Sequence, residues 1–217
     1  MDSALALVTE QGVAGLSLRE AARRAGVSAA APYHHFESRE ALLSALCTEG
    51  FAELSARGEH ALAEAPSDAG SRLVALGRSY VRFAREQPGH FRLMFSTSHN
   101  PTVEGSPLAD PRSLNGFTQL VDAVKAAQRE GAAPAGDPAG LVLLAWTIVH
   151  GLATLTVDGA LADGMPTFAL PPEGLDALAM ETFRALLLAG AAQRSTSASV
   201  RSSAASKPGA RRKAGPR

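Results

Sequence analysis

The sequence predicts an all-α protein, and three observations support this fold class. Apolar residues recur at spacings of three and four through most of the chain, as they do along one face of a helix. Prolines and several glycines fall between these stretches, where they separate one helix from the next. No run of alternating apolar and polar residues indicates a β-sheet.

The stretch 16–43 is predicted to form two short helices around a tight turn, followed by a third helix. Ser17 and Glu20 have the spacing of a capping box at the start of the first of these helices. Gly26 is expected to end it, because glycine accepts the left-handed backbone conformation that often follows a helix. Ser28 can cap the next helix, so the connection is short enough to require a sharp turn.

The first of these helices has a narrow apolar face, and the small Ala22, four residues before Gly26, favours a close crossing of the two helices. The apolar face consists of Leu18, Ala21, Ala22 and Ala25. Arg19, Arg23 and Arg24 are left for solvent or for phosphate groups. Phe36 and Leu42 are expected to pack beneath the pair.

The remaining predicted helices are longer. Ser38 and Glu40 indicate the start of a connector helix that continues to about Glu64 and ends at Pro66. A loop is predicted from Ser96 to Pro111, because four of its residues are proline or glycine. Further helices are predicted over 73–84, 90–95, 114–131, 141–161 and 175–187.

A set of residues in the first quarter of the chain resembles the N-terminal DNA-binding domain of TetR-type transcriptional regulators. The matching residues are Gly12, Ser17, Arg19, Ala22, Ala25, Gly26, Val27, Ser28, Tyr33, His34, Phe36, Arg39, Ala41, Leu42 and Leu43. The resemblance implies an all-helical homodimer whose C-terminal domain binds a small molecule. It predicts an N-terminal three-helix helix-turn-helix domain over 1–47 and a larger helical effector-binding and dimerisation domain over 48–190.

Two departures from the family pattern bear on these expectations. Family members carry a short polar or basic arm before the first helix, whereas this sequence reaches that helix at Asp2, so no contacts from an arm are predicted. Pro32 stands where an aliphatic residue is commoner. In the first turn of a helix its missing N–H costs little, so we expect Pro32 to sharpen the helix start.

The predicted DNA contacts lie in and around the second short helix. Three successive alanines offer only methyl groups to base edges, so much of the specificity is expected from a few polar groups and from DNA shape. Tyr33 and His34 resemble phosphate and base contacts of the family, while His35 is expected to be buried or solvated. The full predicted set is Ser17, Arg19, Ser28, Ala29, Ala30, Ala31, Tyr33, His34 and Arg39.

The nearly all-apolar segment 141–161 predicts a helix that one subunit cannot cover alone. The resemblance implies that it forms the dimer together with the helix near Leu175. Its string WTIVHGLATL, with FRLMF before it, resembles the Trp-His-Gly signature of one C-terminal subclass. An apolar pocket anchored by His150 is one interpretation of the nearby aromatic residues, and simple core packing is the other. The predicted pocket residues are Phe83, Phe91, Met94, Phe95, Phe117, Trp146 and His150.

Charge is distributed unevenly along a chain whose formal net charge is zero. Seven of the 21 basic residues lie after residue 190, where there is no acid, which leaves 14 bases against 21 acids before it. The tail 191–217 is rich in Ser, Ala, Gly and Pro and is predicted to be disordered. It could add electrostatic affinity for DNA or simply aid solubility.

The sequence therefore predicts a cytoplasmic, ligand-responsive DNA-binding regulator, most simply a repressor, which binds a palindromic operator on double-stranded DNA as a homodimer. The predicted effector is a small apolar or aromatic molecule; the alternative is a regulator that acts through a protein partner without such an effector. Cys47, the one cysteine, is expected to be a buried structural thiol. No catalytic residue, metal site, cofactor or membrane span is predicted, because no zinc or phosphate-binding motif occurs and the longest apolar run is short for a bilayer.

Overall fold

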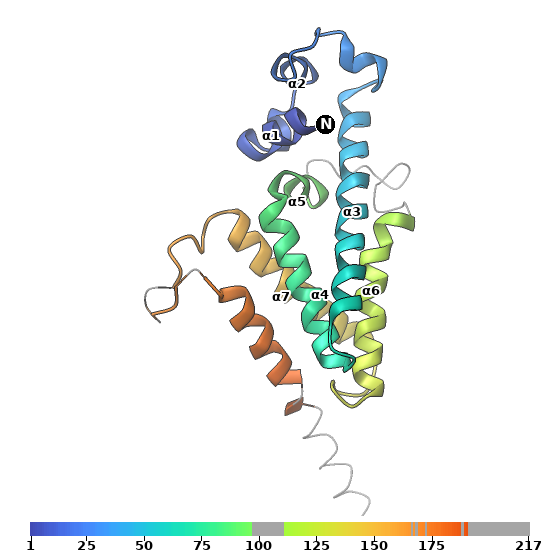
Figure 1. Ribbon diagram of the computed structural model, residues 1–217, viewed down its shortest axis with the longest axis vertical. Helices are drawn as coiled ribbons and strands as arrows, with labels where there is room; N and C mark the ends of the chain where they lie inside the picture. The colour runs from blue at the N-terminus through green and yellow to red at the C-terminus, as the bar shows by residue number, and fades with distance from the viewer. Residues whose placement is uncertain (97–110, 166, 168, 172, 188, 191–217) are drawn as a thin grey trace, which may run out of the picture.

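A computed structural model of the chain describes residues 1–96, 111–165, 167, 169–171, 173–187 and 189–190. These residues form helices joined by turns, with an isolated β-bridge between Met165 and Leu170. The all-α prediction is confirmed (Figure 1). Most of the predicted loop 96–111 and the whole basic tail 191–217 lie outside the described residues.

The helices fall into an N-terminal group and a larger C-terminal group (Figure 1). The N-terminal group contains α1 Asp2–Gln11, the 3-10 helix η1 Val13–Gly15, α2 Leu18–Arg24 and the 3-10 helix η2 Ala31–His34. The larger group contains α3 Arg39–Glu64, α4 Ala69–Glu86, α5 Pro88–Met94, α6 Pro111–Arg129, α7 Pro138–Val157 and a C-terminal helix over 175–190, of which residue 188 is not described.

Helix α3 connects the two groups (Figure 1). The Ser38 Oγ accepts a hydrogen bond from the Ala41 N–H at 3.1 Å, which satisfies one donor of the first turn. The helix ends at Glu64, because Ala65 is extended and precedes Pro66. Both predicted ends of this connector are confirmed.

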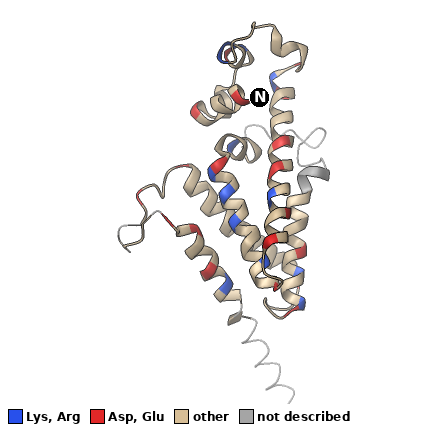
Figure 2. Ribbon diagram, viewed as in Figure 1, with Lys and Arg blue, Asp and Glu red and all other residues tan. Residues whose placement is uncertain are grey.

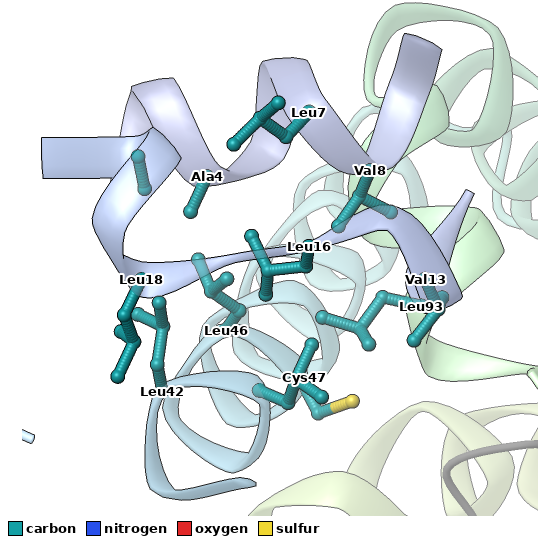
Figure 3. Packing of buried hydrophobic residues seen from close by; sticks show 12 residues of the cluster. Ala4, Leu7, Val8, Val13, Leu16, Leu18, Leu42, Leu46, Cys47 and Leu93 are labelled. Atoms are coloured by element: carbon teal, nitrogen blue, oxygen red, sulfur yellow. The ribbon is translucent and has the colours of Figure 1, made fainter. Parts of the chain in front are cut away.

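The N-terminal helices share a compact apolar core with the start of α3 (Figure 3). Leu7, Leu43 and Leu46 are completely buried there, and each contributes about 1.5–3 kcal/mol by burial. Cys47 is also buried, and burial raises the pKa of its thiol to about 12, so the thiol stays protonated. Leu93 of α5 joins the same core, so α5 packs directly against the N-terminal group.

Helix α4 lies at the centre of the larger group and packs against α3, α6 and α7. Asp68 caps its start, since the Asp68 carboxylate accepts a hydrogen bond from the Ser71 N–H at 2.8 Å. Phe83 of this helix is completely buried. The following helix, α5, begins at Pro88, as Pro is well suited to the first turn.

Helix α7 is apolar on all sides but only partly covered. Among the described helices, α7 is long and apolar enough to cross a membrane, with a mean hydropathy of 1.8 over its most apolar 18 residues. Only 22% of these 18 residues are buried in the structure. It carries no charged residue (Figure 2), and Leu143 is 60% exposed. It ends at Val157, earlier than the predicted residue 161, because turns begin at Asp158. The residues that the structure describes therefore leave much of its outer face uncovered.

Candidate DNA-binding and ligand-binding sites

The turn after α2 has the geometry that the sequence predicts. Gly26 adopts a positive φ of 70°, a conformation that glycine accepts without steric cost. The Val27 N–H returns to the Ala22 carbonyl at 3.1 Å and closes the end of α2. Ala22 is buried at this crossing. The chain thus reverses sharply between α2 and the segment that follows.

The predicted helix capped by Ser28 is instead the short 3-10 helix η2, which begins at Ala31. The Ser28 carbonyl accepts a hydrogen bond from the Ala31 N–H at 3.0 Å, three residues on. An α-helix would use the N–H of residue 32, which Pro32 lacks. Pro32 lies in the first turn as predicted, but it also favours the tighter hydrogen-bonding pattern.

The segment around η2 forms an open polar and methyl-rich surface. Tyr33 is 52% exposed, and His34 and His35 are exposed beside it. Ala31 in this segment is half-buried. The other predicted DNA contacts that are exposed are Ser28, Ala29 and Ala30 before η2, and Ser17 and Arg19 at the start of α2. Seven of the nine predicted DNA contacts are therefore exposed, whereas Ala31 and Arg39 are half-buried.

Two of the three arginines predicted to face solvent or phosphate are held by carboxylates. Arg23 and Arg24 donate hydrogen bonds to Glu20, at 2.7 and 3.2 Å in the closest pairs, and Arg24 also bonds Glu10. These contacts lower the pKa of Glu20 to about 2. The Glu20 carboxylate therefore bonds these arginines in place of the Ser17 N–H, which the predicted capping box requires. The other bond of the capping box is present but long, since the Ser17 Oγ accepts a hydrogen bond of 3.5 Å from the Glu20 N–H.

Arg39 has a structural role that the sequence did not indicate. Its Nε donates to the Leu16 carbonyl at 2.9 Å, and its Nη2 donates to the Val13 carbonyl. The side chain thereby fastens the start of α3 to the segment that leads into α2. A phosphate contact by Arg39 stays a prediction, but this geometry favours positioning of the helix-turn-helix.

The larger group of helices encloses a cavity of about 340 Å³. None of the residues that line it is charged. Helix α3 itself forms part of the wall, so the helix that enters the DNA-binding region also borders the cavity. The lining residues are Phe51, Leu54, Gly58, Leu73, Leu76, Gly77, Ser79, Tyr80, Phe95, Gly116, Phe117, Gln119, Leu120, Ala145, Trp146, Val149, Met180 and Phe183.

The polar part of this wall centres on Tyr80. Its hydroxyl lies 2.9 Å from Nδ1 of His150. Burial raises the pKa of Tyr80 and lowers the pKa of His150, so both side chains are held neutral. A neutral imidazole can accept the hydrogen bond of the Tyr80 hydroxyl. The pair offers hydrogen bonding without a net charge.

The structure divides the predicted pocket residues into two sets. Phe95, Phe117 and Trp146 line the cavity. Phe83, Phe91 and Met94 instead pack in an adjacent core cluster with Phe51, and His150 lies behind Tyr80, against the Phe95 ring at 4.7 Å. Three of the seven predicted residues thus line the cavity, and the other four pack beside it.

Sequence reasoning missed the polar residues of the cavity wall. Tyr80 lies in α4 within the predicted helix 73–84, at a position with the helical spacing of its apolar residues. Gln119 stands among the apolar residues of α6, and its Nε2 donates to the Ser55 carbonyl at 3.0 Å. A polar residue in an apolar stripe is the signal that could have identified both.

Known proteins resemble this chain over both of its parts. Residues 1–46 match the family described as "Bacterial regulatory proteins, tetR family", and residues 73–183 match the "Tetracyclin repressor-like, C-terminal domain". The uncharacterized HTH-type transcriptional regulator YobS of Bacillus subtilis (strain 168) is 26% identical over 104 residues, which are 48% of this chain and 53% of the relative. The match thus spans about half the length of that curated relative.

Two solved structures extend the likeness to nearly the whole described chain. A protein with unknown function from Rhodococcus sp. RHA1 has 36% identity and a TM-score of 0.71, with 86% of this chain and 92% of that chain covered. The regulator FadR from Bacillus subtilis, solved in complex with stearoyl-CoA, has 17% identity and a TM-score of 0.66, with 87% and 96% covered, and shows the shared fold. The chain belongs to the TetR family of DNA-binding transcriptional regulators.

Proposed function

We propose that this TetR-family protein is a repressor that leaves its operator when a small molecule occupies the cavity bordered by α3. The observation that carries the proposal is the position of this uncharged cavity against the connector helix. The proposal requires α3 to have two positions, one that fits the operator and one that does not. A ligand that binds one of these positions more tightly increases the population of that position. We accordingly take residues 1–47 as the DNA-binding domain and residues 48–190 as the effector domain.

The cavity favours an apolar or aromatic effector. Six aromatic side chains form part of its wall, and no lining side chain is a cation that could pair with a buried carboxylate. The Tyr80 hydroxyl supplies a neutral hydrogen-bonding group. The uncharged acyl part of a ligand such as the stearoyl-CoA named for FadR would satisfy these conditions, provided that its charged part stayed outside.

Screening by thermal shift tests this proposal against the alternative of a regulator without a small-molecule effector. A compound that binds only the folded protein raises the melting temperature, by an amount that grows with its concentration. We expect neutral apolar and aromatic compounds to do so and charged analogues of equal size to fail. A library in which no apolar compound raises the melting temperature would favour action through a protein partner.

The exposed surface around η2 is the proposed DNA contact region. Ser17, Ser28 and Tyr33 are accessible donors for phosphate oxygens, and Arg19 adds an exposed cation. His34 is the proposed polar contact to bases, while the methyl groups of Ala29 and Ala30 suit close contact with thymine methyls. Such a surface predicts an operator recognised by few base contacts and by DNA shape.

Tyr33→Phe is expected to weaken DNA binding about fivefold, because removal of one hydroxyl removes one hydrogen bond worth about 1 kcal/mol. The loss should be similar on operator and unrelated DNA, since phosphates carry no sequence information. Fluorescence anisotropy with labelled duplexes measures both. His35→Ala serves as the control and should bind as the wild type does; unchanged binding by Tyr33→Phe would remove Tyr33 from the site.

The exposed apolar face of α7 supports a homodimer formed with the C-terminal helix. Leu143 of α7 is 60% exposed and Leu186 of the C-terminal helix is 66% exposed. A second copy of the chain would cover these faces and would present two η2 segments to the DNA. The half-sites of a palindromic operator should then lie about one helical turn apart, roughly 34–36 Å, or slightly more.

Leu143→Glu is expected to convert the dimer to a monomer, because a carboxylate would be buried in the apolar interface. DNA affinity should fall about 100-fold, since the two half-sites no longer bind as one unit. Light scattering gives the mass, and Met165→Glu, another exposed apolar position, is the control. A wild-type protein that is monomeric at working concentration would contradict the proposed dimer.

A further inference from the structure

Arg92 of α5 joins helices that belong to different parts of the protein. Its Nη1 donates to the Thr9 carbonyl of α1 at 3.0 Å, and its Nη2 donates to the Val157 carbonyl of α7 at 2.8 Å. The Asp158 carboxylate lies 3.8 Å from the same guanidinium. One side chain thus holds the first helix of the DNA-binding domain and the last residue of α7 together.

Both carbonyls that Arg92 binds lie at the C-terminal end of a helix. The last four carbonyls of a helix have no partner within it, and Thr9 and Val157 are within this final turn of α1 and α7. The negative end of each helix dipole also favours a cation there. A planar guanidinium has enough fixed donors to bind two such ends at once, which a lysine amine does not match.

The N-terminal end of α5 is pressed against α1 as well. A Cβ atom at Gly89 would lie 2.7 Å from the Thr9 Oγ1 and 2.8 Å from the Leu5 carbonyl oxygen. Leu93 of α5 is buried in the N-terminal core. Helix α5 therefore cannot shift by much without a matching shift of α1.

The other end of this arrangement reaches the cavity. Phe95, which follows α5, lines the cavity, and so does Trp146 of α7. His150 lies between them, with its ring 4.7 Å from the Phe95 ring and 5.6 Å from the Trp146 ring. A ligand in the cavity thus contacts the two helices whose relative position sets the Arg92 hydrogen bonds.

We infer that Arg92 is a coupling residue, which transmits occupancy of the cavity from α5 and α7 to α1 of the DNA-binding domain. The inference rests on the proposed function, because it needs a ligand in the cavity. Arg92 contacts neither the cavity nor the proposed DNA surface. Replacement of Arg92 should therefore leave ligand binding in the cavity intact and remove the response of the DNA-binding domain to the ligand.

The test uses N-phenyl-1-naphthylamine, an uncharged aromatic fluorophore, with wild-type protein, Arg92→Lys and Arg82→Lys. Energy transfer from Trp146, the one tryptophan, measures binding in the cavity. Amide hydrogen exchange of residues 2–11 measures the response of α1. Arg82 forms an exposed ion pair with Glu86 within α4, so Arg82→Lys is the matched control.

We expect the three proteins to bind the fluorophore within about twofold of one another, because none of the changed residues lines the cavity. Binding should change the exchange of α1 about tenfold in the wild type and in Arg82→Lys, and by less than twofold in Arg92→Lys. An equal change of α1 in Arg92→Lys would overturn the role of Arg92, as would binding that leaves α1 unaffected in the wild type.

Absence of energy transfer in the wild type would overturn the proposed cavity function itself, and the coupling role with it. Loss of fluorophore binding only in Arg92→Lys would also overturn the coupling role, because it would assign Arg92 to the integrity of the cavity. The melting temperature of each variant distinguishes that outcome from general unfolding.

Discussion

Arg39→Ala is expected to lower DNA affinity about 30-fold or more while the cavity keeps its ligand affinity. The substitution leaves the Leu16 and Val13 carbonyls without the charged donor that Arg39 provides. Hydrogen bonds to charged groups contribute about 1.5–3 kcal/mol each when buried, and because solvent weakens both bonds of the half-exposed Arg39 we expect a total of about 2 kcal/mol. The segment that orients α2 and η2 would lose its attachment to α3.

Two measurements separate this positioning role from a phosphate contact. A positioning residue leaves the salt dependence of DNA binding unchanged and increases hydrogen exchange over residues 13–18. A phosphate contact reduces the salt slope by about one and leaves that exchange unchanged. Arg19→Ala, at an exposed predicted phosphate contact, is the matched control and should reduce only the salt slope.

Gly116→Phe is expected to weaken effector binding about 100-fold, the equivalent of about 2.7 kcal/mol. Gly116 lines the cavity, and a Cβ atom there would meet no other atom within 4 Å. A phenyl ring can therefore occupy the space of the ligand. The fold should be retained, since Phe has a higher helix propensity than Gly.

Gly116→Ala is the control for this substitution, because it also raises the helix propensity and adds only a methyl group. Thermal shift and Trp146 fluorescence with the same compound compare the two variants. We expect Gly116→Phe to be as stable as Gly116→Ala without ligand and to lose most of the ligand-dependent stabilisation. Equal affinity in both variants would place the effector elsewhere.

The parts of the fold that depend on local signals could be predicted from the sequence. Ser38 and Pro66 mark the two ends of α3, and the structure confirms both. Gly26 likewise ends α2 as predicted. These features follow from caps and backbone preferences within a few residues.

The sequence patterns were incomplete where a side chain or backbone group has a partner, near or distant in the sequence, that the pattern alone does not identify. Arg39 donates to carbonyls 23 and 26 residues earlier, so its sequence position alone suggested only a phosphate contact. Pro32 lies in a first turn as predicted, but its missing N–H also favours the tighter pattern of η2, in which the Ala31 N–H bonds the Ser28 carbonyl. Glu20 was expected at the helix cap and is held by two arginines instead.

The apolar character of the cavity could be predicted from the sequence, but not which residues line it. Helical spacing identifies the apolar face of α4, α6 and α7, but it does not distinguish a residue that lines a space from one that fills it. Phe95 and Phe91 illustrate the difference, since the rings are 5.2 Å apart and only Phe95 lines the cavity. That distinction depends on how α3, α4, α6, α7, the residue after α5 and the C-terminal helix pack together.

The most direct measurement of the proposed function is the affinity of the wild-type protein for its operator as the cavity is filled. The compound is the one that raises the melting temperature most, and the operator is selected from random palindromic duplexes. We predict that the dissociation constant of the DNA complex rises about tenfold or more, with the same midpoint as the Trp146 fluorescence titration. An unchanged dissociation constant at full Trp146 saturation would contradict a repressor released by a ligand in this cavity.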